Sequence, residues 1–244
     1  MMRTKIITLD EVDSTNRYLH DYHEAPDEDM VVVTARHQTA GRGQGGNRWH
    51  DRAGDNLLFS LLIYPTTVPV ASQYVLSMAE ALAVKEALDG YADGFALKWP
   101  NDVYWHDSKI SGTLIEAAVG REGLRRMILG TGININQHSF AIDAPNPVSL
   151  YQILGREVPV EEVLQRILAA FEHYYGVVLS GDYERVGRLY HAALYRREGY
   201  HAYRDGEGRF EACLDHVEPD GRLVLRDRDG RVRTYRFKEV AYII

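Results

Sequence analysis

A glycine- and arginine-rich stretch between two apolar runs most strongly constrains how this chain can fold. Residues 39–55, TAGRGQGGNRWHDRAGD, contain five glycines and three arginines, and the apolar runs 30–35 and 56–64 flank them. Both runs predict buried strands, so we expect a long polar loop between two core strands. Backbone N–H groups of glycines, together with neighbouring arginine side chains, are suited to binding anionic oxygens. Composition alone equally allows a mobile surface loop.

The glycine pattern of this loop differs from two common nucleotide-binding motifs. No Gly-Lys-Ser or Gly-Lys-Thr follows the glycines, as a Walker A loop requires. No helical pattern follows them either, as a dinucleotide-binding fingerprint requires. An anion-binding site in this loop would therefore be of a different type from these two motifs.

The composition of the chain is ordinary for a globular protein of one or two domains. Its net charge of −7 argues against nucleic acid as the main partner, because that interaction needs clustered Lys and Arg. The single cysteine, Cys213, excludes an intramolecular disulfide and a cysteine-based metal site. No apolar run approaches membrane-spanning length, and no secretory apolar region follows the first residues. We therefore expect a cytoplasmic protein with neither a membrane nor DNA as a partner.

The hydrophobic pattern of residues 1–194 predicts a domain that contains both helices and strands. Apolar runs and alternation predict strands at residues 5–9, 30–35, 56–64, 95–99, 103–105, 109–119 and 124–136. Helical periodicity and end signals predict helices at residues 13–23, 70–89, 160–179 and 182–194, with a single turn at 149–154.

The pattern changes near residue 195. Short apolar runs at 200–203, 210–217, 223–226, 232–237 and 240–243 are separated by Asp-Gly turns. Tight turns between short strands predict a small β-barrel. Residues 195–244 carry 11 Lys/Arg and 10 Asp/Glu, so this part is nearly neutral. We expect a first domain at residues 1–194 and a second at 195–244.

Four polar clusters lie at predicted strand ends or in loops, where binding residues are common. They are Ser14-Thr15-Asn16, the glycine–arginine loop with Gln38 before it, KWPND at 98–102 with KISG at 109–112, and GTGININ at 130–136. The first cluster is also typical of a helix cap, and Pro-Asn-Asp is typical of a β-turn. Lys109 is typical of a solvated lysine, yet one hairpin turn would bring it close to Asp102. A lysine there suits a phosphate.

In this order, the clusters resemble the motifs of the biotin protein ligase family. The family pattern is STN, an AGRG-type loop that ends in Trp, KWPND, K(I/L)(S/A)G and GxGIN. This chain has Ser14-Thr15-Asn16, AGRG at 40–43 with Trp49, KWPND, KISG and GTGIN. The resemblance covers residues 5–194, and residues 195–244 resemble the SH3-like tail of the family through weaker motifs.

The resemblance implies an α+β fold, in which a mixed, mainly antiparallel sheet packs with helices as in class II synthetases and lipoate ligases, followed by a small SH3-like β-barrel. It implies a ligase that joins biotin to ATP, giving biotinyl-5′-AMP and pyrophosphate. Biotin would then pass to one lysine of a biotin carboxyl carrier protein. Mg²⁺ would arrive on the ATP phosphates, with no fixed metal site on the protein. Relatives occur as monomers and dimers, so a homodimer is possible.

Residue-by-residue matching gives an expected site. Arg42 and Lys109 would neutralise charge that develops during adenylation, and Asp102 would lie near the attacking amine. Biotin would contact Ser14, Thr15, Asn16, Gln38, Arg42, Gly43, Gln44, Lys109 and Gly112. The nucleotide would contact Arg48, Trp49, Asn101 and Asn134. The loop would order over the adenylate and exclude water.

Two departures from the family pattern affect these expectations. Many relatives have arginine where this chain has Gln44, so we expect adenylate retention to depend more on Arg42, Arg48 and Lys109. The catalytic pattern begins by Lys5, so we expect no N-terminal helix-turn-helix domain and no DNA binding.

Two other functions compete with biotin ligation. A lipoate or octanoate ligase would share the fold and chemistry, but those proteins lack the GRG loop with its tryptophan and the KWPND string. A non-catalytic module that binds biotin or an adenylate would need none of the three catalytic candidates, yet Arg42, Asp102 and Lys109 are all present.

Overall fold

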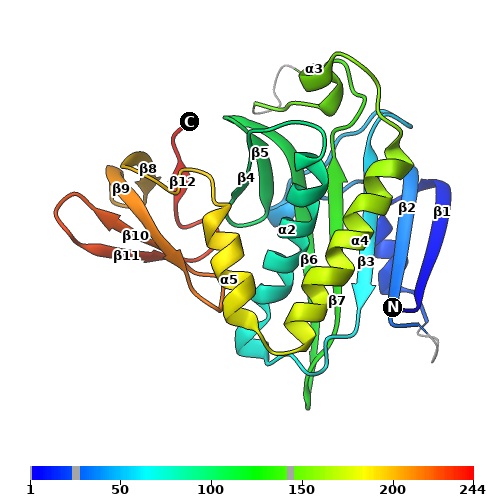
Figure 1. Ribbon diagram of the computed structural model, residues 1–244, viewed down its shortest axis with the longest axis horizontal. Coiled ribbons are helices and arrows are strands. Elements are labelled where there is room, and N and C mark those ends of the chain that lie inside the picture. The colour runs from blue at the N-terminus through cyan, green and yellow to red at the C-terminus, as the bar shows by residue number, and fades with distance from the viewer. Residues whose placement is uncertain (1, 24–27, 142–145) are drawn as a thin grey trace.

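The computed structural model describes residues 2–23, 28–141 and 146–244, and its main element is a seven-stranded sheet (Figure 1). The strands are β1 (Thr4–Val12), β2 (Met30–Gln38), β3 (Leu57–Ile63), β4 (Phe95–Lys98), β5 (Asp102–Trp105), β6 (Ser108–Gly120) and β7 (Gly123–Ile133). Their order is β1-β2-β3-β7-β6-β5-β4, and only the β1–β2 pair is parallel. The expected mixed, mainly antiparallel sheet is confirmed.

Helices cover the two faces of this sheet unequally. The long helices α2 (Tyr74–Asp89) and α4 (Val160–Leu179) lie side by side over one face, with α5 (Tyr183–Ala192) beside α2 (Figure 1). The short helix α1 (Thr15–His20) packs on the other face, where its Leu19 joins Val31, Val33, Leu62 and Ile128. All seven residues of β3 are buried because both faces are covered there, which explains its continuous apolar sequence.

The remaining short elements are η1 (Gln44–Gly46), η2 (Val70–Ser72) and α3 (Leu150–Leu154). The predicted helix 70–89 is thus a 3-10 turn followed by α2, and the predicted helix 13–23 is shorter. The predicted loop 39–55 contains η1 and a β-bridge between Arg42 and Arg48, so it is more structured than its composition indicated. None of the described helices is long and apolar enough to cross a membrane.

A second sheet follows α5 along the chain. Its strands are β8 (His201–Asp205), β9 (Gly208–Val217), β10 (Leu223–Asp227), β11 (Val232–Tyr235) and β12 (Ala241–Tyr242), all antiparallel, in the order β11-β10-β9-β8-β12. Gly221 and Gly230 have φ of 90° and 82°, as the predicted Asp-Gly turns require. Among the described residues, β11 and β12 lie at opposite ends of this order and do not pair with each other. We therefore describe a five-stranded sheet, whereas a barrel was expected.

Candidate functional site

The floor of the site is the sheet face opposite α2, where β6 and β7 carry glycines. Gly112 on β6 is directly across from Gly132 on β7. A Cβ at Gly130 would lie 1.7 Å from Asn16 Oδ1, and a Cβ at Gly132 would lie 2.3 Å from Trp49 Cε2. Glycine is therefore required at both positions, because Asn16 and Trp49 lie directly on the strand backbone.

A narrow cavity of about 40 Å³ lies on this floor. It is lined by residues from α1, the end of β2, the loop 39–55, the corner after β4, and strands β6 and β7: Ser14, Thr15, Asn16, Gln38, Arg42, Gly43, Gln44, Trp49, Asn101, Lys109, Gly112, Thr113, Leu114, Gly130, Thr131 and Gly132. A space of this size holds only a few water molecules. A larger ligand therefore requires the loop or Trp49 to move.

A chain of hydrogen bonds fixes the polar wall of the narrow cavity. Gln38 Oε1 accepts from the Thr15 backbone N–H at 2.8 Å. Ser60 Oγ lies 2.7 Å from Thr15 Oγ1 and 2.6 Å from Asn16 Oδ1. Asn16 Nδ2 donates to Glu116 Oε2 at 2.7 Å. Because the Asn16 amide has partners at both its oxygen and its nitrogen, its orientation is fixed.

The helix-cap interpretation of Ser14 is wrong for its side chain. Ser14 occupies the N-cap position of α1, but its side chain makes no capping hydrogen bond. The residue is 4% exposed and lines the narrow cavity. A ligand could therefore bind this hydroxyl without breaking a helix cap.

Arg42 pairs with a carboxylate that the sequence did not point to. Arg42 Nη2 donates to Glu116 Oε1 at 3.1 Å and to Oε2 at 3.3 Å, while the arginine side chain is 48% exposed. His20 Nε2 lies 3.5 Å from the same carboxylate. An anionic ligand would have to compete with Glu116 for Arg42.

Lys109 and Asp102 form an ion pair, with 2.7 Å between Nζ and Oδ1. The hairpin of β5 and β6 brings them together, as their spacing predicted. Close by, Lys98 Nζ lies 4.7 Å from the ring centroid of Tyr104 and 4.9 Å from that of Tyr242. Burial lowers the pKa of the Lys98 ammonium, and the Asp102 carboxylate partly opposes this shift. The junction thus holds two lysines and one carboxylate.

A wide cavity of about 850 Å³ continues from this junction. The loop 39–55, the corner after β4 and the last residues of the chain all contribute to its lining. Lys238 Nζ, near the C-terminus, donates to the Gly45 carbonyl oxygen at 2.9 Å. Trp99 Nε1 donates to the Gly221 carbonyl oxygen at 2.8 Å, which attaches the second sheet to the first. The second sheet therefore closes one side of the wide cavity.

Every residue predicted for the site lines at least one of the two cavities. Ser14, Thr15, Asn16, Gln38, Arg42 and Gly112 line the narrow cavity, Arg48, Asp102 and Asn134 line the wide one, and Gly43, Gln44, Trp49, Asn101 and Lys109 line both. The side chains of Asn101 and Asn134 also have structural bonds, to Thr113 O at 2.5 Å and to Val148 O at 3.1 Å. Their contacts with a nucleotide stay a prediction.

Four residues around the site were missed: Ser60, Glu80, Glu116 and Lys238. Two of them had a visible signal, because Ser60 is the only polar residue in LLFSLLI and Glu80 is the only charge in VLSMAEALAV. A lone polar residue in an apolar element is informative, since burial requires a partner for it. Glu116 and Lys238 lie in polar surroundings and gave no comparable signal.

The described residues contain no group of three or more His, Cys, Asp or Glu side chains that could hold a metal ion. Asp102, the carboxylate at the junction of the two cavities, pairs with Lys109. Any Mg²⁺ is treated as part of a MgATP substrate.

Comparisons with known proteins show what the chain is similar to. The chain is 30% identical over 206 residues to a biotin–[acetyl-CoA-carboxylase] ligase from Paracoccus denitrificans, covering 82% of this chain and 85% of that protein. It is 28% identical over 241 residues to the bifunctional ligase/repressor BirA of Bacillus subtilis, covering 96% and 73%.

Solved structures and a family model point the same way. The biotin protein ligase from Aquifex aeolicus in complex with biotin and ATP superposes with a TM-score of 0.79 at 26% identity, covering 97% of each chain. The model of the biotin/lipoate A/B protein ligase family matches residues 9–134. The chain therefore belongs to the biotin/lipoate A/B protein ligase family.

Proposed function

We propose that the protein is a biotin protein ligase, which condenses biotin with ATP to biotinyl-5′-AMP and pyrophosphate and then transfers biotin to a lysine of a biotin carboxyl carrier protein. One observation carries this proposal: the narrow polar cavity and the wide cavity share Lys109, which pairs with Asp102 at their junction. A small acid in the first cavity would meet a nucleotide in the second at this lysine.

The narrow cavity suits the ureido ring of biotin. That ring has two N–H donors and a carbonyl acceptor, and the wall offers hydroxyl and amide groups on Ser14, Thr15 and Asn16. These residues are at most 4% exposed, so a bound ring would lose few hydrogen bonds to water. The glycines of β6 and β7 would let the ring lie close to the strand backbone.

The first chemical step joins two anions, so it depends on positive charge. A carboxylate oxygen of biotin attacks the α-phosphorus of ATP, and the bond to the pyrophosphate oxygen breaks. Lys109 would neutralise charge that builds up on the α-phosphate. Arg42 would leave Glu116 and bind the same anions, which links adenylate formation to a movement of the loop.

The second step needs an uncharged amine. The ε-amine of the acceptor lysine attacks the carbonyl carbon of the mixed anhydride, an amide bond forms, and AMP leaves. Asp102 is half-buried beside the junction and would orient this amine or accept its proton. Its pairing with Lys109 keeps the carboxylate close to the reacting atoms.

Biotin-dependent exchange of labelled pyrophosphate into ATP tests the first step. We expect exchange only when biotin is present, with lipoate and octanoate inactive as replacements. A second assay adds a biotin carboxyl carrier domain and follows its increase in mass by one biotinyl group. Exchange that ignores biotin, or exchange supported by lipoate or octanoate, would contradict the proposal and favour the alternatives.

A further inference from the structure

A buried carboxylic acid lies beneath the glycine floor. Glu80 on α2 is 1% exposed and lies on the helix side of the sheet. It contacts Thr113 on β6 and Thr131 on β7, which are directly across from each other in the sheet. The adjacent pair of glycines, Gly112 and Gly132, forms the floor on the opposite face. Glu80 is thus the polar group under the narrow cavity.

The oxygens of these three side chains form a closed ring of contacts. Thr131 Oγ1 lies 2.6 Å from Glu80 Oε1, and Thr113 Oγ1 lies 3.1 Å from Glu80 Oε2. The two threonine hydroxyls lie 3.0 Å apart. The ring has three contacts, but two hydroxyls supply only two hydrogens. A proton on Glu80 supplies the third, so that each of the three side chains donates once and accepts once, the acid through its O–H and its carbonyl oxygen.

The surroundings of Glu80 favour the protonated acid. Burial raises the pKa of Glu80 to about 7, and hydrogen bonds from the two hydroxyls oppose this shift only in part. No ion pair among the described residues involves Glu80, and those on neighbouring elements include Asp102 with Lys109 on the strands, Glu162 with Arg166 on α4 and Glu184 with Arg188 on α5. Glu80, Thr113 and Thr131 are all buried.

We propose that Glu80 is a positioning residue which, as a neutral acid, closes a three-hydrogen-bond ring with Thr113 and Thr131 and so holds the glycine floor in the shape that binds biotin. This inference rests on the proposed biotin ligase function. Glu80 itself would not touch the substrate, because the sheet separates the acid from the cavity.

The floor needs such support because its glycines contribute no side chains of their own to the site face. Gly112, Gly130 and Gly132 have no side chains to lock the two strands together on the site face, and glycine backbone is the most flexible. A satisfied buried polar network, in contrast, stiffens its surroundings. Thr113 also anchors the corner after β4, because its N–H donates to Asn101 O at 2.9 Å and its carbonyl accepts from Asn101 Nδ2.

Glutamine offers a sharp test, because an amide can close the same ring without a titratable proton. Infrared spectra of the protein should show a protonated carboxyl band at pH 6 that weakens by pH 9 and is absent in Glu80→Gln. The biotin KM from pyrophosphate exchange should match between the two proteins at pH 6. At pH 9 the KM of the unmodified protein should exceed that of Glu80→Gln about fivefold, the value of one neutral hydrogen bond.

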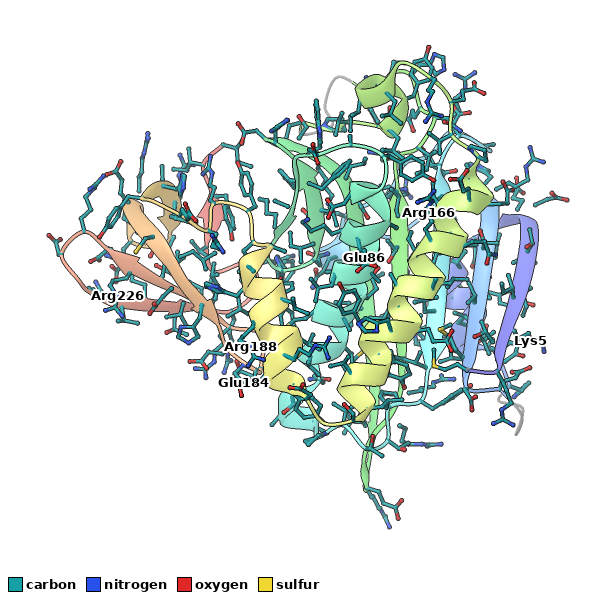
Figure 2. All side chains as sticks on the ribbon, viewed as in Figure 1. Lys5, Glu86, Arg166, Glu184, Arg188 and Arg226 are labelled. Carbon is teal, nitrogen blue, oxygen red and sulfur yellow. The ribbon has the colours of Figure 1, made fainter. Side chains whose placement is uncertain are left out.

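Glu80→Leu removes the ring and should raise the biotin KM at both pH values, with a smaller effect on kcat. A purely structural loss would instead lower kcat through fewer folded molecules and leave KM unchanged. Glu86→Gln is the matched control on the same helix (Figure 2), because Glu86 is exposed and accepts a hydrogen bond from the Tyr174 hydroxyl.

Three results would overturn the proposal: no carboxyl band specific to Glu80, superimposable pH profiles of KM, or an unchanged KM in Glu80→Leu. Failure of the proposed function is separate. It would appear as missing biotin-dependent exchange in the unmodified protein, whereas the infrared measurement needs no activity.

Discussion

The narrow and wide cavities meet at Lys109 but are built from different kinds of structure. Thr15 and Asn16 form part of the polar wall of the narrow cavity and Ser60 bonds to both; each of the three is at most 3% exposed and has a hydrogen-bond partner. The wide cavity depends on exposed groups, such as the bond from Lys238 to the Gly45 carbonyl. Its arginine, Arg48, is exposed as well.

This difference matches the needs of the two proposed substrates. A neutral ureido ring is recognised by hydrogen bonds of fixed direction, and preorganised groups keep the entropy cost of binding low. A nucleotide must enter, react and leave as AMP or pyrophosphate, so one side of its site has to open. The comparison predicts that variants of the wall change biotin affinity and that variants of the loop or tail change nucleotide handling.

The junction between the cavities should give the largest effect. Lys109→Met removes the charge at the α-phosphate, and we expect the rate of biotin-dependent pyrophosphate exchange to fall at least about 100-fold. Lys85→Met is the matched control, because Lys85 forms an ion pair of the same 2.7 Å length with Asp89 but lines neither cavity. Equal losses in the two variants would contradict a role at the junction.

The fixed wall should give the next largest effect. Ser60→Ala removes the donor to Asn16 Oδ1 and one of the two partners of Thr15 Oγ1, which keeps Gln38 Oε1; an unpaired buried acceptor costs about 1–3 kcal/mol. We expect biotin to bind about 10-fold more weakly by calorimetry, with an unchanged KM for ATP. Thr34→Val is the control, since it removes a hydroxyl bonded to Leu58 O elsewhere on the sheet. An equal rise in the KM for ATP would break the proposed division between the cavities.

Local patterns predicted the fold well because most elements here have strong local signals. The β3 sequence LLFSLLI is apolar throughout and is a fully buried strand, and helix 160–179 was predicted with the observed bounds. The barrel was less predictable, since closure depends on contacts between distant strands. The hydrogen-bond ring around Glu80 could not be predicted from the sequence either, because only the sheet register brings Thr113 and Thr131 together.

Removing the contact between the C-terminal segment and the loop 39–55 should have a moderate effect, and only on nucleotide binding in the wide cavity. Lys238→Met removes the bond to the Gly45 carbonyl, and we expect the KM for ATP to rise about fivefold, the value of one hydrogen bond. Gly45→Ala should act similarly, because its φ is 71° and a Cβ would lie 2.2 Å from Lys238 Cε. The double variant should then show less than the sum of both effects.

A suitable control for the tail is Arg228→Met, which breaks an ion pair with Glu211 inside the second sheet. It should leave the KM for ATP unchanged. If it raises this KM as much as Lys238→Met does, the second sheet acts through its overall stability. The bond to the loop would then have no specific role.

The smallest expected effects concern the charge of the loop. Gln44 lines both cavities, and its buried Oε1 has no hydrogen-bond partner among the described residues. Gln44→Arg adds a positive charge there, and we expect the adenylate to dissociate about threefold more slowly, within the range of an exposed ion pair. Arg48→Ala should accelerate release to a similar extent. Both changes should shrink as salt rises, because exposed charges are screened.

Stopped-flow measurement of adenylate release at low and high salt would separate these outcomes. If Arg48→Ala leaves the rate unchanged at low salt, Arg48 does not retain the adenylate and the idea that it compensates for Gln44 fails. If Gln44→Arg alters biotin affinity instead, the loop acts as part of the wall of the narrow cavity. The loop would then have to be counted with the fixed biotin site and not with the mobile nucleotide site. If only the rate of adenylate release changes, and this change depends on salt, the loop belongs to the nucleotide site. The sheet would then hold the neutral ureido ring, and groups that can move would hold the charged nucleotide.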